Sequence, residues 1–411
     1  MTMTSKVIRH CQVCNFKNLE PILFLGYAPP PSQMHVIGET LSEQPSYPIQ
    51  LLYCPHCHLV QLGLAVAPHI VFPPEFPYTS STTKSLRDNF GELYQECLTF
   101  IPLGPSDLIV DIGSNDGNLL SYFLKHQVLG VTPENIGEIA IQRGIPTIID
   151  FFNKNVAQKI KSEKGLATFV TATNVFAHVE NVHEMVENIL EILSPKGIFV
   201  SESHYLVPFL EKLQYDTIYH EHLRYYSLHS LSYLLKMHGL EIIHAKQIPT
   251  HGGSLRIYAA RKNTYPIQTT VTEALNKENP IVCNKNNFID FRNKVTQSKL
   301  ALHHLLFTVL KEKKNIYGIG AAARATTLIN YVSLDNGILT CIVETEGSHK
   351  IGKYIPGTLI PVYEESKLFQ DQPEYALLLS WHLANTLIPK IKEKGFKGKF
   401  IIPLPAPTIV S

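Results

Sequence analysis

Two pairs of cysteines near the start of the chain have the spacing of a metal site. Cys11 and Cys14 are separated by two residues, as are Cys54 and Cys57, so one turn in each pair could direct both thiolates at one ion. Four thiolates fill the tetrahedral shell of zinc, which predicts a structural Zn²⁺ that adds to the folding free energy. Two nearby histidines leave a mixed Cys/His site open, and two unrelated pairs of buried thiols are the other alternative.

A dense polar run lies between apolar stretches at residues 215–227, YDTIYHEHLRYYS, and holds Tyr219, His220, Glu221 and His222. Burying such a cluster is costly unless it serves a purpose. A histidine titrates near neutral pH and can take a proton from a carbon beside a carbonyl, after which a tyrosine or second histidine can donate to the enolate oxygen. On a strand, His220 and His222 would share a face and could hold a metal; a hydrogen-bonded structural cluster is the other alternative.

The segment DLIVDIGSNDGNLLSYFL (107–124) predicts a cofactor loop between a buried strand and a helix. The acid at the strand end and the absence of G-x-G-x-x-G argue against a dinucleotide, because a pyrophosphate favours a helix N-terminus with no anion beside it. S-adenosylmethionine carries no phosphate, and its ammonium group can use nearby acids. We therefore predict that S-adenosylmethionine binds here, with a purely structural tight turn as the alternative. The predicted contacts are Asp111, Gly113, Asn115, Asp116 and Gly117.

The contact to the cofactor's ribose departs from the expected pattern. Thr132 stands where we expect an acid after the second strand, and Glu134, two residues further on, is the predicted substitute. One lost hydrogen bond to a charged group costs roughly 1.5–3 kcal/mol, which would weaken binding without abolishing it. Asn174, after the next core strand, is expected near the cofactor or, alternatively, as a helix N-cap.

Alternating strands and helices must position these residues. Apolar runs predict buried parallel strands, and amphipathic stretches such as HEMVENILEIL predict helices between them, which indicates a doubly wound α/β sheet. A polar helical segment (265–310) leads to a second α/β block that begins with NIYGIGAAARATTLIN (315–330). The predicted strands are 107–113, 127–133, 168–174, 197–203, 338–344 and 375–381.

The composition is ordinary for a soluble globular protein of two to four domains, with 45% hydrophobic and 17% charged residues among 411. The formal net charge of +1 provides no field that would draw nucleic acid or a membrane surface. The N-terminus lacks the apolar core of a secretory signal, and no apolar run is long enough to span a membrane. The chain has seven cysteines, four of them in two C-x-x-C pairs. An odd number with this spacing fits a metal site in a reducing compartment better than a set of disulfides. We therefore expect a cytoplasmic protein, and a monomer because no heptad pattern or long apolar stripe stands out.

In the order of its motifs the chain resembles the sugar C-methyltransferases of antibiotic deoxysugar pathways, over essentially its whole length. The resemblance implies an S-adenosylmethionine-dependent enzyme that methylates C3 of a nucleotide-linked 4-keto sugar. Besides the cysteine pairs, the motifs are FPYTSSTT (76–83), GSNDG (113–117), NVFAHVENV (174–182), DTIYHEHLRYYSL (216–228), HGGSLRIY (251–258), YGIGAAARATTLINY (317–331) and KIGKYIPGTLIPV (350–362).

The same resemblance implies a small zinc-binding domain (1–72), a central class I methyltransferase domain with a Rossmann-like fold (73–290) and a C-terminal Rossmann-like domain (291–411). It implies His222 as the base. Four further residues would share that site, and a glycine-rich loop would border it. These residues are Tyr219, Glu221, Tyr78 and His178 for the site, and His251, Gly252, Gly253 and Ser254 for the loop.

The C-terminal block holds the candidate contacts to the nucleotide-linked sugar. Gly320 opens a turn into a helix, and Arg324 follows in the first helical turn, an arrangement that can seat a diphosphate. The alternative is close packing of strand and helix with a surface arginine. Lys350, Lys353 and Tyr354 are weaker candidates for the nucleotide.

Three other functions remain open at this point. An O- or N-methyltransferase on the same scaffold would need no proton removal from carbon. A non-enzymatic zinc- or nucleotide-binding protein is favoured if Thr132 reflects a lost cofactor pocket. An NAD-dependent oxidoreductase would use the C-terminal block.

Overall fold

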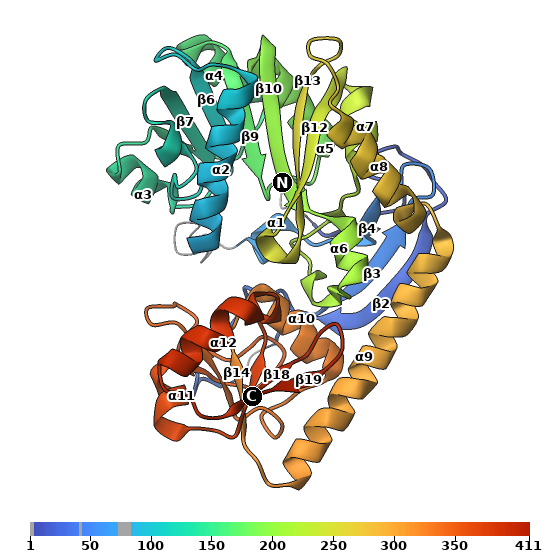
Figure 1. Ribbon diagram of the computed structural model, residues 1–411, viewed down its shortest axis with the longest axis vertical. Helices are drawn as coiled ribbons and strands as arrows, with labels where there is room; N and C mark the ends of the chain where they lie inside the picture. The colour runs from blue at the N-terminus through green and yellow to red at the C-terminus, as the bar shows by residue number, and fades with distance from the viewer. Residues whose placement is uncertain (1–3, 41–42, 73–83) are drawn as a thin grey trace.

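The computed structural model describes residues 4–40, 43–72 and 84–411. In this part of the chain, three sheets of seven, four and six strands are accompanied by one two-stranded sheet. Figure 1 shows a green and yellow α/β unit at the top, an orange and red α/β unit at the bottom, and blue N-terminal strands beside both. The long helix α9 (Lys285–Lys311) runs from the upper unit to the lower one.

The seven-stranded sheet carries the predicted cofactor loop. Its order is β12-β13-β10-β9-β6-β7-β8; β6 to β10 run parallel, and β12 and β13 add an antiparallel edge. The four strands predicted in this block are confirmed, and the antiparallel edge is an addition to the prediction. The strands are β6 (Leu108–Ile112), β7 (Gln127–Thr132), β8 (Thr147–Ile149), β9 (Ala167–Thr173), β10 (Leu193–His204), β12 (Leu240–Ile248) and β13 (Ser254–Arg261).

Helices cover both faces of this sheet, which explains why β6 is apolar along its whole length. Ile109 shares one core with Leu93 of α2, and Val110 shares the other with Ile189 of α5. The prediction of a helix after the cofactor loop is wrong. This segment forms η2 (Leu120–Phe123), a short 3₁₀ helix whose first and last residues are both buried. The helices are α2 (Lys84–Phe100), α3 (Gly137–Gln142), α4 (Lys154–Lys164), α5 (Val182–Ile192), α6 (Leu206–Glu211), α7 (Leu228–Met237) and α8 (Thr269–Val282).

The N-terminal part forms the four-stranded sheet β11-β4-β3-β2 and the pair β1-β5. One strand of the larger sheet, β11, comes from the predicted histidine run, more than 160 residues further along the chain. The strands are β1 (Lys6–Val7), β2 (Glu20–Ala28), β3 (Tyr47–Tyr53), β4 (Val60–Leu62), β5 (Leu64–Ala65) and β11 (Arg224–Tyr225), with a short helix α1 (Pro68–Val71).

The C-terminal sheet has the order β16-β15-β14-β17-β18-β19, parallel except for β19. The helical segment predicted over 265–310 is confirmed as α8 and α9, and Asn284 caps the second of these. The elements are β14 (Ile316–Ile319), α10 (Ala323–Val332), β15 (Cys341–Glu344), β16 (Val362–Glu364), α11 (Ser366–Asp371), β17 (Tyr375–Leu378), η5 (Trp381–Leu383), α12 (Ala384–Glu393), β18 (Lys399–Ile402) and β19 (Thr408–Val410).

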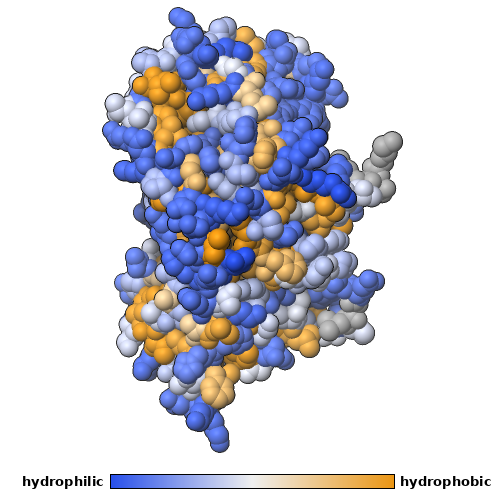
Figure 2. Space-filling view, turned by 90° about the vertical axis from the view of Figure 1, so that its right-hand side faces the viewer, coloured by the Kyte–Doolittle hydropathy of each residue, from blue (hydrophilic) through white to orange (hydrophobic). Residues whose placement is uncertain are grey.

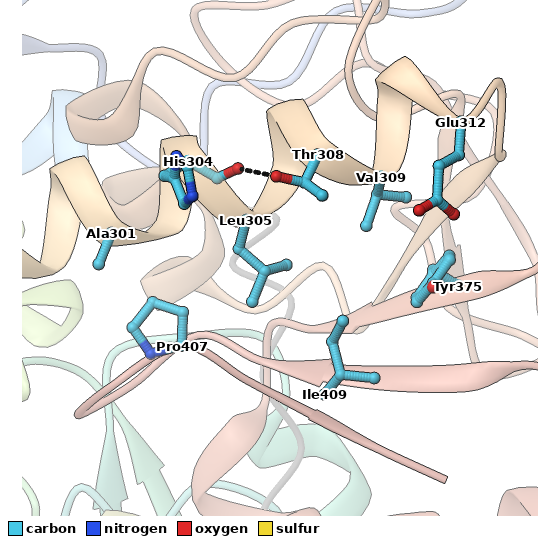
Figure 3. Close-up of a pocket in the computed structure, with 9 residues that line it drawn as sticks. All are labelled: Ala301, His304, Leu305, Thr308, Val309, Glu312, Tyr375, Pro407 and Ile409. Carbon is cyan, nitrogen blue, oxygen red and sulfur yellow. Dashed lines mark hydrogen bonds between the residues drawn. The ribbon is translucent and has the colours of Figure 1, made fainter.

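A groove of about 440 Å³ lies between α9 and the edge strand β19, where His304 and Leu305 face Pro407 and Ile409 (Figure 3). On the face drawn in Figure 2, hydrophilic and hydrophobic side chains are interspersed. No helix in the described ranges is long and apolar enough to cross a bilayer.

Candidate active site

The four cysteines converge, as predicted. Their sulfur atoms all lie within 4.8 Å of one another, with Cys11 Sγ 3.4 Å from Cys57 Sγ and Cys14 Sγ 3.4 Å from Cys54 Sγ. Thiolates at about 2.3 Å from one tetrahedral zinc would be separated by about 3.8 Å, so the group fits the ion closely. This geometry and the donor set confirm the predicted structural zinc site.

The two histidines near the second pair serve other contacts. His58 Nδ1 lies 2.7 Å from the hydroxyl of Tyr53, and the ring of His56 stacks on Phe16. Among the described residues, only the four cysteines form a group able to hold a metal. The mixed Cys/His alternative is therefore wrong.

The cofactor loop lies at the carboxyl ends of β6, β7 and β9. Gly113 has φ +75°, and a Cβ there would come within 2.4 Å of Val175; Gly117 has φ +78°, and its Cβ would meet Ile145 at 2.6 Å. Both glycines are thus required by backbone conformation and by packing. Asn115, between them, also has positive φ.

Two acids of the loop are buried. Asp111 Oδ1 accepts a hydrogen bond from Thr171 Oγ1 at 2.6 Å, and burial together with the nearby charge of Glu202 raises the pKa of Asp111 to about 7. Asp116 has no exposed side-chain surface and pairs with Arg143 at 3.0 Å. The predicted contacts of these acids to the cofactor stay predictions.

Thr132, which stands in place of the acid expected at the ribose, makes a buried contact with the predicted substitute. Thr132 is fully buried at the end of β7, and its hydroxyl donates to Glu134 Oε2 at 2.9 Å. The pKa of Glu134 is raised by burial. Thr132 therefore orients the carboxylate that was predicted to take the place of the missing acid.

Asn174 follows β9 with φ +59°, and its N–H donates to the carbonyl of Glu202 at 2.8 Å. The next helix, α5, is capped by Asn181 instead. The alternative role of Asn174 as a helix cap is therefore wrong.

The histidine segment, defined as residues 215–226, begins with the 3₁₀ helix η3 (Tyr215–Thr217) and reaches β11 through turns. His220 and His222 consequently do not share the face of a strand. The His220 ring packs against Tyr47, and its Nε2 lies 3.2 Å from the Tyr47 carbonyl oxygen. The metal site proposed for this histidine pair on a strand is not formed in the described structure.

His222 has one defined tautomer. Its Nδ1 lies 3.0 Å from the carbonyl oxygen of Thr217, which can only accept, so Nδ1 carries the hydrogen. Nε2 therefore accepts from the hydroxyl of Tyr219 at 3.0 Å. Burial lowers the pKa of His222 well below its usual value, and the neighbouring His178 and His204 lower it further. The ring is neutral at physiological pH, and among the described residues its lone pair faces the Tyr219 hydroxyl.

His178 lies beside this ring, with 5.0 Å between ring centres. Its Nδ1 donates to the carbonyl oxygen of Glu221 at 2.8 Å, and burial lowers its pKa to about 4. Burial raises the pKa of the Glu221 carboxyl to about 8, against the opposing effect of Lys350. The predicted residues His178, Tyr219 and His222 are thus brought together as two neutral imidazoles and a hydroxyl, and Glu221 joins them through its backbone carbonyl. Tyr78 lies outside the described residues.

His204, at the end of β10, is a member of this region that sequence reasoning missed. Its Nε2 lies 3.0 Å from Gln214 Oε1, while Gln214 Nε2 donates to the carbonyl of Gly252 at 3.0 Å. Nδ1 of His204 is buried without a hydrogen-bond partner among the described residues. A histidine directly after the buried run GIFVSES was the signal that could have identified it.

The predicted glycine-rich loop borders the same region. Lys212 Nζ and Gln214 both donate to the carbonyl of Gly252. His251 is exposed and has φ +54°, a backbone strain of about 1–3 kcal/mol that is typical of functional sites. Gly253 also has positive φ, and Ser254 begins β13.

The residues of the C-terminal block that were predicted to contact the substrate lie in two separate regions. Gly320 directly follows β14 and has φ +90°, and Arg324 in the first turn of α10 forms an ion pair with Asp216 of the histidine segment. Lys353 and Tyr354 pair through their backbone with the N-terminal segment around Val36. The predicted contacts of these residues to substrate stay predictions.

Comparisons with known proteins cover the whole chain. Three family models match successive parts: "Putative zinc binding domain" over residues 11–72, "Methyltransferase domain" over 86–245 and "C-methyltransferase C-terminal domain" over 249–405. The chain is 29% identical to the C-methyltransferase NovU of Streptomyces niveus over 98% of this chain and 97% of that protein.

Solved structures match only in part. The N-methyltransferase NodS from Bradyrhizobium japonicum is 13% identical, with a TM-score of 0.35 over 44% of this chain and 90% of that chain. Magnesium protoporphyrin IX methyltransferase from Synechocystis is 14% identical, with a TM-score of 0.33 over 43% of this chain and 79% of that chain. The three family models and the full-length relative bear out the resemblance seen in the motifs: the chain is similar over nearly its whole length to C-methyltransferases, and it is an S-adenosylmethionine-dependent C-methyltransferase.

Proposed function

We propose that this enzyme methylates C3 of a nucleotide-linked 4-keto sugar through an enolate, with His222 as the base. The observation that carries the proposal is the fixed tautomer of His222, whose only basic atom, Nε2, faces the hydroxyl of Tyr219 at 3.0 Å. The motif resemblance and the similarity to the C-methyltransferase NovU favour transfer of a methyl group to carbon.

The base acts through Nε2. The Tyr219 hydroxyl turns from His222 to the carbonyl oxygen of the bound sugar, which frees the lone pair of Nε2 for the proton on C3. The hydrogen bond from Nδ1 to Thr217 holds the ring in place during this transfer. Such a positioned base contributes about 10²–10⁴-fold in rate.

The enolate oxygen receives hydrogen bonds from neutral donors. Glu221 is protonated at neutral pH because its buried carboxyl has a pKa of about 8, so it can donate rather than repel. Together with Tyr219 it stabilises the developing negative charge in a site with little water. Burial keeps His222 neutral, and His178, which packs against it, lowers the pKa of His222 further.

The loop after β6 fits S-adenosylmethionine, which supplies an electrophilic methyl group when bound. The buried acids Asp111 and Asp116 suit its ammonium group, and Glu134 suits its ribose hydroxyls. Two polar atoms of the same loop, Ser114 Oγ and Asn118 Nδ2, are buried without a partner in the described ranges, so both could hydrogen-bond to the bound cofactor.

The sugar diphosphate enters from the side of the C-terminal domain. His251 and the backbone of Gly252 and Gly253 border the sugar, while Gly320, Lys353 and Tyr354 contact the nucleotide.

A product analysis tests the proposal. The purified protein is incubated with S-adenosylmethionine labelled with ¹³C in the methyl group and a thymidine diphosphate-linked 4-keto-6-deoxy sugar, and the product is examined by NMR. A ¹³C methyl resonance coupled through carbon to C3 is expected. A methyl on oxygen or nitrogen, or no transfer with any nucleotide-linked keto-sugar, contradicts it.

A further inference from the structure

An ion pair joins the histidine segment to the C-terminal domain. Arg324 Nε and Nη2 donate to the two carboxylate oxygens of Asp216 at 2.7 and 3.0 Å, and Trp381 Nε1 donates to the same carboxylate at 2.8 Å. The side chain of Asp216 has no exposed surface, and that of Arg324 is 8% exposed. Both charged groups are removed from water, so the two parallel hydrogen bonds must compensate for the hydration that they lose.

The third nitrogen of the guanidinium group is also held by the protein. Nη1 of Arg324 lies 2.6 Å from Nδ1 of His382, which must accept because a guanidinium group only donates. The guanidinium carbon lies 5.1 Å from the centre of the Trp381 ring. The group predicted to seat a diphosphate is thus bound to protein partners through all three nitrogens.

The same helix holds the histidine segment at a second point. Thr327, almost one turn after Arg324, donates from Oγ1 to the carbonyl of Ile218 at 3.0 Å. Between the two anchored residues lies Thr217, whose carbonyl oxygen fixes the tautomer of His222. Contacts to α10 therefore flank that carbonyl on both sides.

We infer that Asp216 and Arg324 are positioning residues: docking of α10 on the histidine segment sets the orientation of His222, and Arg324 does not bind the substrate. The inference rests on the proposed role of His222 as the base. Displacement of a reacting group by about 1 Å can cost about a hundredfold in rate. Loss of the bidentate pair should therefore lower turnover while substrate affinity is retained.

Arg324→Lys tests this, because lysine keeps the charge but lacks the planar fork. We expect kcat for methyl transfer, and the rate of solvent deuterium exchange into the keto-sugar, to fall by about tenfold or more. KM for the sugar and Kd for free thymidine diphosphate should stay within about twofold of wild type. A large rise in the Kd for thymidine diphosphate with unchanged exchange at saturation would assign Arg324 to the diphosphate and overturn the inference, as would no change at all.

Thr327→Val decides the matter if Arg324→Lys does not fold, because it removes one neutral hydrogen bond and leaves the ion pair intact. A fall of about two- to tenfold in kcat and in exchange is expected, with KM unchanged; unchanged kcat would contradict the inference. Thr326→Val is the matched control, since this buried neighbour on α10 makes no hydrogen bond through its hydroxyl to the described part of the histidine segment. Absence of exchange by wild type contradicts the proposed function itself, whereas normal exchange by wild type and both variants contradicts only the positioning role.

Discussion

Gln61 and Arg224 lie opposite each other in the antiparallel pair of β4 and β11. Gln61 follows the zinc-binding Cys57 by four residues, and Arg224 follows His222 by two. The side chain of Gln61 also donates to the carbonyl of His10, next to the first cysteine pair. The zinc site and the predicted base are therefore connected through one pair of short strands.

This connection predicts that zinc is required for turnover although it lies outside the reaction. Cys57→Ser should reduce bound zinc below one ion per chain, because a complete tetrahedral set is lost. Methyl transfer should fall by about a hundredfold, since β11 then loses its fixed partner. Affinity for S-adenosylmethionine, measured by calorimetry, should remain, because the cofactor loop belongs to the separate seven-stranded sheet.

Cys283→Ser is the matched control, because Cys283 is partly buried and does not belong to the cysteine cluster. It should keep both zinc and activity. A zinc-free Cys57→Ser protein with wild-type turnover would show that the two sites are independent.

Glu134 should contribute to cofactor affinity in place of the acid that Thr132 replaces. Glu134→Ala removes a carboxylate positioned by Thr132 at 2.9 Å. Loss of a hydrogen bond to a charged group is expected to raise the Kd for S-adenosylmethionine by about tenfold or more. Glu138→Ala, an exposed carboxylate on α3, is the control for net charge. Equal Kd values for the two variants would remove Glu134 from the cofactor site.

Turnover should decline at alkaline pH because Glu221 must be protonated to donate. Its pKa of about 8 means that the donor hydrogen is present at neutral pH and is lost as the pH rises through about 8. His222 remains neutral over this range, since burial lowers its pKa. The profile of kcat against pH should therefore fall on the alkaline side only.

Glu221→Gln keeps a donor that does not titrate, so its kcat should lose this alkaline fall. Lys350→Met should move the fall to higher pH, because the charge of Lys350 lowers the pKa of Glu221. An unchanged alkaline fall in Glu221→Gln would assign it to another group.

Local patterns were sufficient to predict the two α/β blocks and the metal site. The spacing within each cysteine pair directs both thiolates at one ion. Apolar runs such as 107–113 must be buried on both faces, as in a parallel sheet. Neighbouring residues in the chain, such as Tyr219 and His222, also stay neighbours in space.

Contacts between distant segments could not be predicted in this way. Arg324 reads as a free cation at a helix start, and only the packing of α10 on the histidine segment reveals its partner Asp216, 108 residues earlier. The buried pair of Glu202 and Arg256 likewise requires the antiparallel pairing of β10 with β13, which the apolar pattern alone does not indicate. The segment after the cofactor loop forms only the short 3₁₀ helix η2, and the local apolar pattern did not distinguish this from a longer α-helix.

The central claim is that His222 removes the proton from carbon before the methyl group is transferred. The most direct test is solvent deuterium exchange into a thymidine diphosphate-linked 4-keto-6-deoxy sugar in D₂O without S-adenosylmethionine, followed by NMR for wild type and His222→Ala. We expect wild type to exchange the hydrogen on C3, and the variant to do so at least about a hundredfold more slowly while binding S-adenosylmethionine normally. Equal exchange by the folded variant and wild type would contradict the account.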